Sequence, residues 1–76
     1  DKKHPFYDII FANINRNILI DQISSYAKAL KVGGNLFLSG FYKDDKQLLF
    51  NSCQKENLTL VSTKENKTWC AMKFAK

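Results

Sequence analysis

The stretch Tyr-Asp-Ile-Ile-Phe-Ala-Asn-Ile-Asn, residues 7–15, decides how this chain folds. It is an apolar run that ends in a polar amide, and a helical pattern begins just beyond it. A short apolar run bounded in this way is typical of a buried strand in a parallel sheet. In open α/β sheets, ligands bind at the carboxyl ends of such strands. Asn13 lies at that end, so it is the first candidate for a functional residue.

The segments that follow predict a helix and a second strand. Residues 17–30 carry apolar side chains at spacings of three and four, as one face of an amphipathic helix does: Leu19, Ile23, Tyr26, Ala27 and Leu30. Gly33-Gly34 is expected to end this helix and turn the chain. Residues 35–39 are expected to form a short strand, which Gly40 ends. Strand, helix and strand together predict a βαβ unit.

The second half predicts one more helix and a hairpin. The helix is expected from Lys43 or Asp44 to Glu56, with an inner face made of Leu48, Leu49, Ser52 and Cys53. Residues 58–63 are rich in β-branched side chains, residues 65–67 suit a hairpin loop, and residues 68–74 alternate as a strand does. The predicted fold is α/β, in the order β-α-β-α-β-β, with parallel strands and a terminal antiparallel hairpin. No linker divides it, so residues 1–76 are expected to form one unit.

Composition and charge narrow the function classes. The chain has 76 residues and a net charge of +5, and Arg16 is its single arginine. No apolar stretch approaches the roughly 18 residues that a membrane span requires, so no membrane partner is expected. The lysines are spread along the chain without a run, whereas recognition of phosphates and bases usually enlists arginine. The charge therefore favours an ordinary solvated basic surface over a nucleic-acid interface.

The cysteines and the histidine do not suggest a metal site. One histidine and two cysteines form no standard zinc spacing, so no metal is expected. Cys53 and Cys70 are expected to be reduced and buried, as in a cytosolic protein, although a disulfide between them stays open at this point. His4 lies in a charged entry loop, and Asp44-Asp45 suits an ordinary helix start.

Three stretches together resemble a known family. Residues 8–14, Asp-Ile-Ile-Phe-Ala-Asn-Ile, resemble the fourth motif of S-adenosylmethionine-dependent methyltransferases with a Rossmann-like sheet. Residues 29–41 resemble the helix, glycine turn and fifth strand of that family, and the hairpin with Trp69 and Ala71 resembles its sixth and seventh strands. The chain is most similar to the bacterial members that methylate large-subunit ribosomal protein eleven. In those enzymes Ala-Asn-Ile ends the fourth strand and Leu-Ser-Gly ends the fifth.

The resemblance implies a cytoplasmic protein N-methyltransferase that uses S-adenosyl-L-methionine and modifies amino groups of a ribosomal protein. Asn13 would contact the cofactor and the target amine, and Ile14 and Phe41 would contact the substrate; no catalytic residue is implied. The family's glycine-rich loop, and the acidic residue that binds the cofactor ribose, have no counterpart in these 76 residues. The resemblance thus covers only the C-terminal half of a methyltransferase domain, and the isolated chain is expected to be inactive.

Each of these candidate residues also has a purely structural interpretation. Asn13 also suits the cap of the next helix. Ser39, Gly40 and Phe41 suit either a wall of the substrate pocket or a strand-to-helix turn with one packed aromatic ring. Trp69 can stack on a ligand, but a hairpin or core position is the simpler expectation.

Two other functions also remain open. One is a related methyltransferase acting on RNA or a small molecule, although Ile14-Asn15 follows Asn13 where amino-methylating nucleic-acid enzymes carry Pro-Pro-aromatic. The other is a basic α/β interaction module without catalysis. In a fragment of a larger sheet, one edge of the first strand would have no neighbour, so the isolated chain is expected to self-associate.

Overall fold

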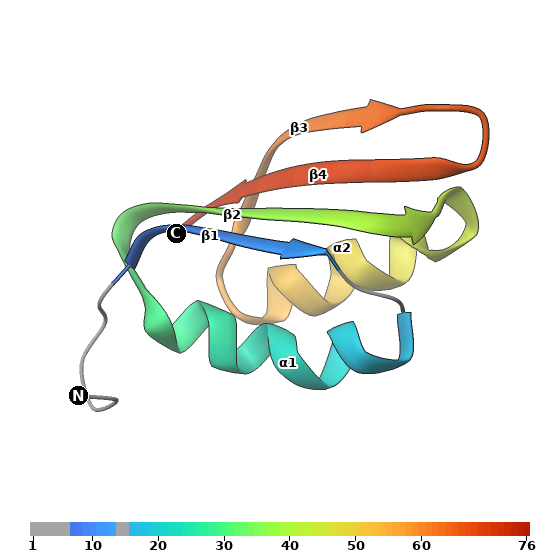
Figure 1. Ribbon diagram of the computed structural model, residues 1–76. Helices are drawn as coiled ribbons and strands as arrows, with labels where there is room; N and C mark the ends of the chain where they lie inside the picture. The colour runs from blue at the N-terminus through green and yellow to red at the C-terminus, as the bar shows by residue number, and fades with distance from the viewer. Residues whose placement is uncertain (1–6, 14–15) are drawn as a thin grey trace.

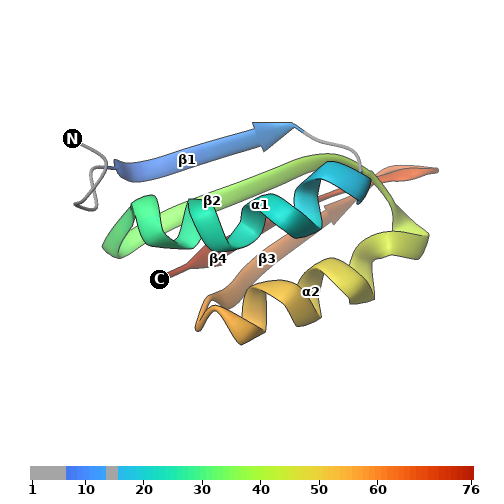
Figure 2. The same ribbon diagram turned by 90° about the horizontal axis from the view of Figure 1, so that it is seen from below.

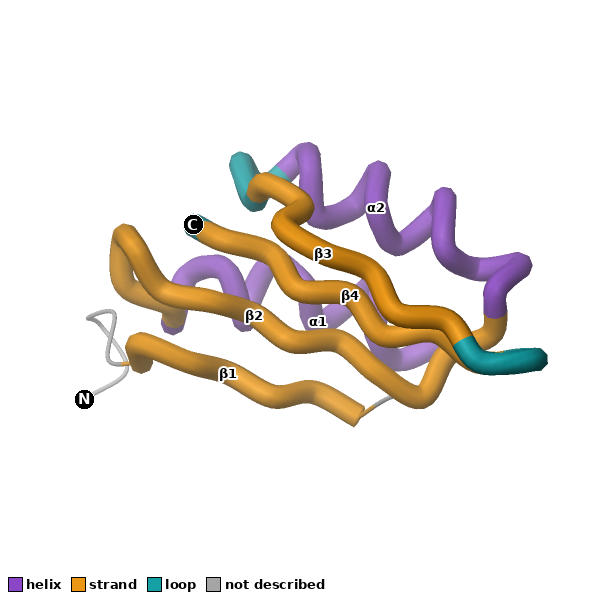
Figure 3. The backbone as a smooth tube through the Cα atoms, turned by 90° about the horizontal axis from the view of Figure 1, so that it is seen from above, coloured by secondary structure: helices purple, strands orange, loops and turns teal. Residues whose placement is uncertain are grey.

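The strand that the apolar run predicts is present and lies at one edge of a four-stranded sheet. The computed structural model describes residues 7–13 and 16–76, and in it β1 spans Tyr7–Asn13. It runs parallel to β2, which spans Leu30–Tyr42. The hairpin strands β3, Thr59–Glu65, and β4, Trp69–Ala75, are antiparallel to each other, and β4 is also antiparallel to β2. The sheet order is therefore β1-β2-β4-β3, as Figure 3 shows from above.

The two helices lie on the same face of this sheet. Helix α1 spans Arg16–Ala29 and connects β1 to β2. A single 3-10 turn, Lys43–Asp45, leads from β2 into α2, Lys46–Lys55, which connects to the hairpin. Figures 1 and 2 show both helices packed beneath the sheet, and no helix of the described residues covers the opposite face. The described part is thus a two-layer structure with one open sheet face.

The core fills the space between the helices and the sheet. Its buried residues are apolar and come from every element except β3 and the 3-10 turn; they are Ala12, Ile23, Ala27, Leu30, Leu36, Leu38, Phe41, Leu49, Cys53, Leu58, Cys70, Met72 and Phe74. The alternation predicted in the last strand is confirmed, because Cys70, Met72 and Phe74 are buried while the residues between them are more exposed. Burial of this one face is the main favourable term in the folding of the chain.

Three details of the predicted elements are wrong. Helix α1 ends at Ala29, before Gly33-Gly34, and β2 begins at Leu30, so the glycine pair lies inside a strand of 13 residues. Gly40 does not end that strand, which continues to Tyr42. Leu48 is exposed, because Leu49 and Cys53, one turn apart, define the side of α2 that faces the sheet.

Lys76 forms hydrogen bonds with the end of α1 and with the glycine pair. The Lys76 Nζ donates hydrogen bonds to the backbone carbonyls of Ala27 and Leu30, which satisfies acceptors at the end of α1. The Lys76 backbone exchanges hydrogen bonds with Gly33 and Gly34, at 2.9 and 3.0 Å. A Cβ on Gly34 would lie 2.8 Å from the Asp8 carbonyl oxygen and 2.9 Å from that of Lys31.

The close approach at Gly34 yields a test of this packing. We expect Gly34→Ala to lower the free energy of unfolding by about 1–3 kcal/mol, because backbone carbonyls cannot yield as a flexible side chain does. Urea unfolding followed by circular dichroism measures the change. Val32→Ala, in the same segment but 88% exposed, is the control and should change stability by less than about 0.5 kcal/mol. Equal effects of the two substitutions would contradict the packing described here.

Candidate functional site

Asn13 and Ser39 lie side by side at one end of the sheet. Because β1 and β2 are parallel, their carboxyl ends meet at the same edge, and the register pairs Asn13 with Ser39. Their neighbours Ala12 and Leu38 are buried under the helices, so strand alternation directs Asn13 and Ser39 to the open face. Asn13 is exposed and Ser39 is half-buried. An amide and a hydroxyl, each able to donate and accept hydrogen bonds, therefore occupy the position where α/β sheets bind ligands.

A β-bulge at Gly40 determines which aromatic ring reaches this end of the open face. The β2–β4 register shifts between Ser39 and Phe41, and Gly40 has a φ of 86°, which favours glycine. The extra residue reverses the alternation of the strand. Phe41, which a regular strand would direct to the same side as Ser39, is turned into the core, and Tyr42 is exposed in its place.

The bulge changes the site expected from the resemblance. Phe41 is 1% exposed and pairs in register with the buried Cys70, so its ring supports the end of the strand from within the core. Direct contact of this ring with a substrate finds no support in that position. Ile14, the other expected substrate contact, lies outside the described residues. Sequence reasoning missed Tyr42, although a glycine inside an apolar strand pattern is itself a signal for a bulge.

Tyr42 and Trp69 form an exposed aromatic pair beside this end of β2. They are opposite each other in the β2–β4 register, and Trp69 is 43% exposed, so it is a hairpin residue and not a core residue. A shallow hollow of about 230 Å³ adjoins them and is lined by Tyr42, Lys43, Asp44, Lys67 and Thr68. The Lys43 backbone N–H donates to the Thr68 carbonyl at 3.3 Å, which ties the 3-10 turn to the hairpin loop.

Near the hairpin, the Glu65 side chain forms ion pairs with two lysines. The Glu65 carboxylate accepts a hydrogen bond from the Lys46 Nζ and lies 3.9 Å from the Lys43 Nζ. The hydrogen bond from Lys46 lowers the pKa of Glu65 and raises the pKa of Lys46, and the positive charge of Lys43 adds to the first effect. Because these side chains are exposed to water, the network adds little stability, although it links the start of α2 with the end of β3.

The cysteines show no sign of nucleophilic chemistry. Both are free and buried, as expected from the sequence, so a disulfide between them is excluded in this structure. Desolvation raises the pKa of Cys53 to about 12 and also raises that of Cys70, which keeps both thiols protonated at neutral pH.

Within residues 7–13 and 16–76, no group of three or more His, Cys, Asp and Glu side chains could hold a metal ion. Among the same residues, no helix is long and apolar enough to cross a membrane.

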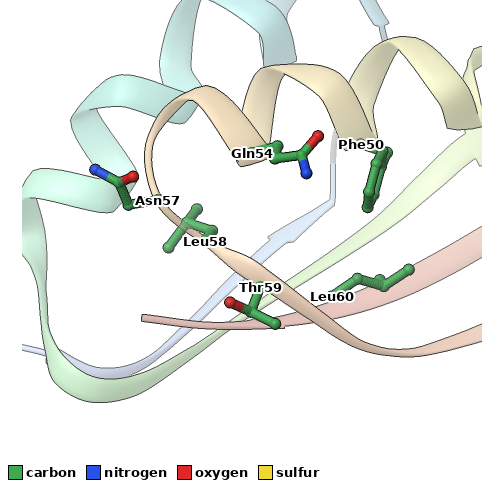
Figure 4. A pocket seen from close by; sticks show the side chains of 6 residues that line it. All are labelled: Phe50, Gln54, Asn57, Leu58, Thr59 and Leu60. Atoms are coloured by element: carbon green, nitrogen blue, oxygen red, sulfur yellow. The ribbon is translucent and has the colours of Figure 1, made fainter.

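A second groove lies at the opposite end of the sheet. It has a volume of about 470 Å³ and is lined by Phe50, Gln54, Asn57, Leu58, Thr59 and Leu60, as Figure 4 shows. Thr59 pairs with Ala75, which in turn pairs with Asn35 near the amino-terminal half of β2. The groove is therefore separated from Asn13 and Ser39 by the length of the strands. It does not belong to the candidate site.

Comparison with known proteins identifies relatives of the whole chain. A family model described as "Ribosomal protein L11 methyltransferase (PrmA)" matches residues 1–76. A protein of Porphyromonas gingivalis is 46% identical over 70 residues, and one of Bacteroides thetaiotaomicron is 46% identical over 72 residues; both are described as ribosomal protein L11 methyltransferases. The matches cover 92% and 95% of this chain but 24% and 25% of the relatives. The chain thus spans about a quarter of their length.

A solved structure shows the same fold. The ribosomal protein L11 methylase of Lactobacillus delbrueckii subsp. bulgaricus superposes with a TM-score of 0.86 at 20% sequence identity. The superposition covers 91% of this chain and 36% of that one. The expected fold, part of a Rossmann-like methyltransferase sheet, is confirmed.

The bulge at Gly40 predicts opposite behaviour for two adjacent aromatic residues. We expect Phe41→Leu to lower the free energy of unfolding by about 1–2 kcal/mol, because it leaves a cavity in the core. Tyr42→Leu, at a side chain that is 66% exposed, should cost less than about 0.5 kcal/mol. Thermal unfolding of both variants provides the measurement. A larger loss in Tyr42→Leu than in Phe41→Leu would show that the strand continues without the bulge.

Proposed function

The chain belongs to the ribosomal protein L11 methyltransferase family, and we propose that it forms part of an S-adenosylmethionine-dependent enzyme that methylates amino groups of that ribosomal protein. One observation carries the proposal. Asn13 and Ser39 are paired at the carboxyl ends of two parallel strands and face the open side of the sheet. This is the edge at which α/β enzymes bind their ligands.

Asn13 suits the positioning of an amine. Its Oδ1 accepts a hydrogen bond from an N–H of the target amine, which holds the nitrogen and directs its lone pair away from the amide. The amide does not titrate near neutral pH, so Asn13 orients the amine without removing its proton. The Ser39 hydroxyl, paired with Asn13 in the register, offers a second group that can donate or accept at the same edge.

The residues of this chain fit one wall of a cofactor site. S-adenosyl-L-methionine, when bound, supplies a methyl group on a positively charged sulfur. A polar amide and a hydroxyl are compatible with that charge. All three glycines of the chain lie in β2, so none forms a glycine-rich loop after β1. The isolated chain therefore offers only part of the contacts that such a cofactor requires, and we propose that it is inactive alone.

The location we propose is the cytoplasm. Two free, buried thiols are typical of a reducing compartment. The ribosomal protein substrate would be met there. Recognition of that substrate is assigned to the longer polypeptide, since the relatives extend well beyond the segment matched here.

The role of Asn13 is tested in the longer enzyme that contains this segment. We expect Asn13→Ala to lower kcat/KM for methyl transfer to the ribosomal protein about 100-fold, because a loosely held amine loses its near-attack geometry. Transfer of a labelled methyl group measures the rate. Asn35→Ala is the matched control. Asn35 carries the same amide side chain, but it lies on β2 and pairs with Ile9, away from the end of β1 where Asn13 lies. A rate for Asn13→Ala equal to that of the control would contradict the proposed role.

The incomplete site predicts weak cofactor binding by the isolated chain. Calorimetric titration of the 76 residues with S-adenosyl-L-methionine should give no binding in the micromolar range, because most contacts to the cofactor come from elsewhere. A longer polypeptide of the family serves as the positive control. Micromolar binding by the isolated chain would mean that Asn13, Ser39 and their neighbours form a complete site.

A further inference from the structure

The ends of several elements meet beside the edge that carries Asn13 and Ser39. Tyr42 is the last residue of β2, and Lys43 and Lys46 begin the 3-10 turn and α2. Glu65 ends β3 and Trp69 begins β4. Figures 1 and 3 show the turn after β2, the hairpin loop and the end of β1 at the same end of the sheet. We call Tyr42, Lys43, Lys46, Glu65 and Trp69 the edge junction.

Backbone hydrogen bonds hold the two loops of the edge junction together. The Lys43 N–H donates to the Thr68 carbonyl at 3.3 Å, so the residue after Tyr42 is bound to the residue before Trp69. Within the hairpin loop the Asn66 N–H donates to the Trp69 carbonyl at 2.9 Å. Tyr42 and Trp69 are also partners in the β2–β4 register. A displacement of the hairpin loop would therefore be transmitted to the end of β2.

The Glu65 carboxylate adds side-chain contacts from β3 to this connection. It accepts a hydrogen bond from the Lys46 Nζ, and its second oxygen lies 3.9 Å from the Lys43 Nζ. The contacts reach the start of the 3-10 turn and the start of α2 from the last residue of β3. Because all three side chains are partly exposed to water, the free energy of these contacts is small. Their effect is on the position of the turn.

Tyr42 depends on that position because the core does not enclose its ring. The bulge at Gly40 turns Tyr42 to the open face, where its side chain is 66% exposed. The next residue is Lys43, whose backbone and side chain both contact the hairpin. A ring that is already fixed loses less conformational freedom when a ligand binds than a mobile ring does. The placement of Tyr42 therefore bears on affinity at this edge.

We propose that Glu65 is a positioning residue for the substrate: through Lys43 and Lys46 it fixes Tyr42, which contacts the polypeptide segment around the target amine. Glu65 pairs with the buried Cys70 and so lies on the helix side of the hairpin, away from the open face. It therefore acts through its neighbours and affects substrate binding, not the methyl-transfer step. The inference rests on the proposed function for the identity of the substrate.

Steady-state kinetics of the longer enzyme that contains this segment test the proposal. Glu65→Gln keeps the size of the side chain and removes its charge. It should raise KM for the ribosomal protein about threefold and leave kcat unchanged, as loss of an exposed ion pair that acts on binding alone would do. Glu65→Asp keeps the charge and should recover most of the affinity. Glu56→Gln is the matched control, because it removes the same charge at the other end of α2 and should not change KM.

A double-mutant cycle with Tyr42→Leu tests whether Glu65 acts through Tyr42. Tyr42→Leu should raise KM about tenfold, because aromatic side chains contribute strongly to protein contacts. In that background Glu65→Gln should have no further effect, since the side chain that it positions is gone. Additive effects of the two substitutions would overturn the proposal. An unchanged KM in Glu65→Gln, a fall in its kcat alone, or an equal rise of KM in Glu56→Gln would overturn it as well.

Fluorine NMR without substrate tests the edge junction independently of activity. Trp69 is the single tryptophan of this chain, so fluorotryptophan incorporated into the longer enzyme places a probe opposite Tyr42, and Trp69→Phe identifies its resonance. Glu65→Gln should shift or broaden this resonance, whereas Glu56→Gln should leave it unchanged. An unaltered resonance in Glu65→Gln would overturn the proposal. Absence of methyl transfer even in the unsubstituted enzyme would instead refute the proposed function, and the fluorine spectrum would still decide the positioning role.

Discussion

The register of β2 against its two neighbours is the constraint on which the rest of the structure depends. On one side β2 runs parallel to β1, which brings Asn13 beside Ser39. On the other side it pairs antiparallel with β4, which carries three of the buried core residues. Because alternate residues of a strand face opposite sides, a shift of one residue in either register would exchange core and open-face side chains. The same strand thus determines the core and the candidate site.

The bulge at Gly40 allows β2 to supply side chains both to the core and to the open face of the sheet. Leu36 and Leu38 face the helices, and in a regular strand the next inward position would be Gly40, which has no side chain to bury. The bulge moves that position to Phe41, whose side chain joins the buried core. It also moves Tyr42 outward, next to Trp69. One glycine with positive φ therefore improves the packing of the core and provides an aromatic side chain near the ligand-binding edge.

Much of the architecture could be predicted from the sequence, because local patterns dictate it. The apolar run at Tyr7–Asn13 and the alternation of Cys70, Met72 and Phe74 correspond to strands with nearly the predicted bounds. What could not be predicted depends on contacts between distant residues. The early end of α1 involves Lys76, which lies more than forty residues away in sequence from the carbonyls that it caps.

The candidate site, too, could be predicted from the sequence only in part. Asn13 could be located because its position follows from the end of one strand, and its partnership with Ser39 follows from parallel pairing. For Phe41 the sequence left two interpretations open, a wall of the substrate pocket or a packed ring. The bulge, which depends on pairing between β2 and β4, places the ring in the core. A periodic pattern reports which residues alternate, but the position of a bulge depends on the neighbouring strand.

The unequal burial of the two sheet faces links the fold to the site. Asn13 and Ser39 lie on the open face, at the end of the same surface that carries Phe11 and Phe37. In water, an amide at this edge forms hydrogen bonds with solvent as readily as with an amine. Exclusion of water strengthens each polar contact and makes orientation of the amine worthwhile. Exclusion of water from this end of β1 would therefore let the Asn13 amide bind an amine in preference to solvent.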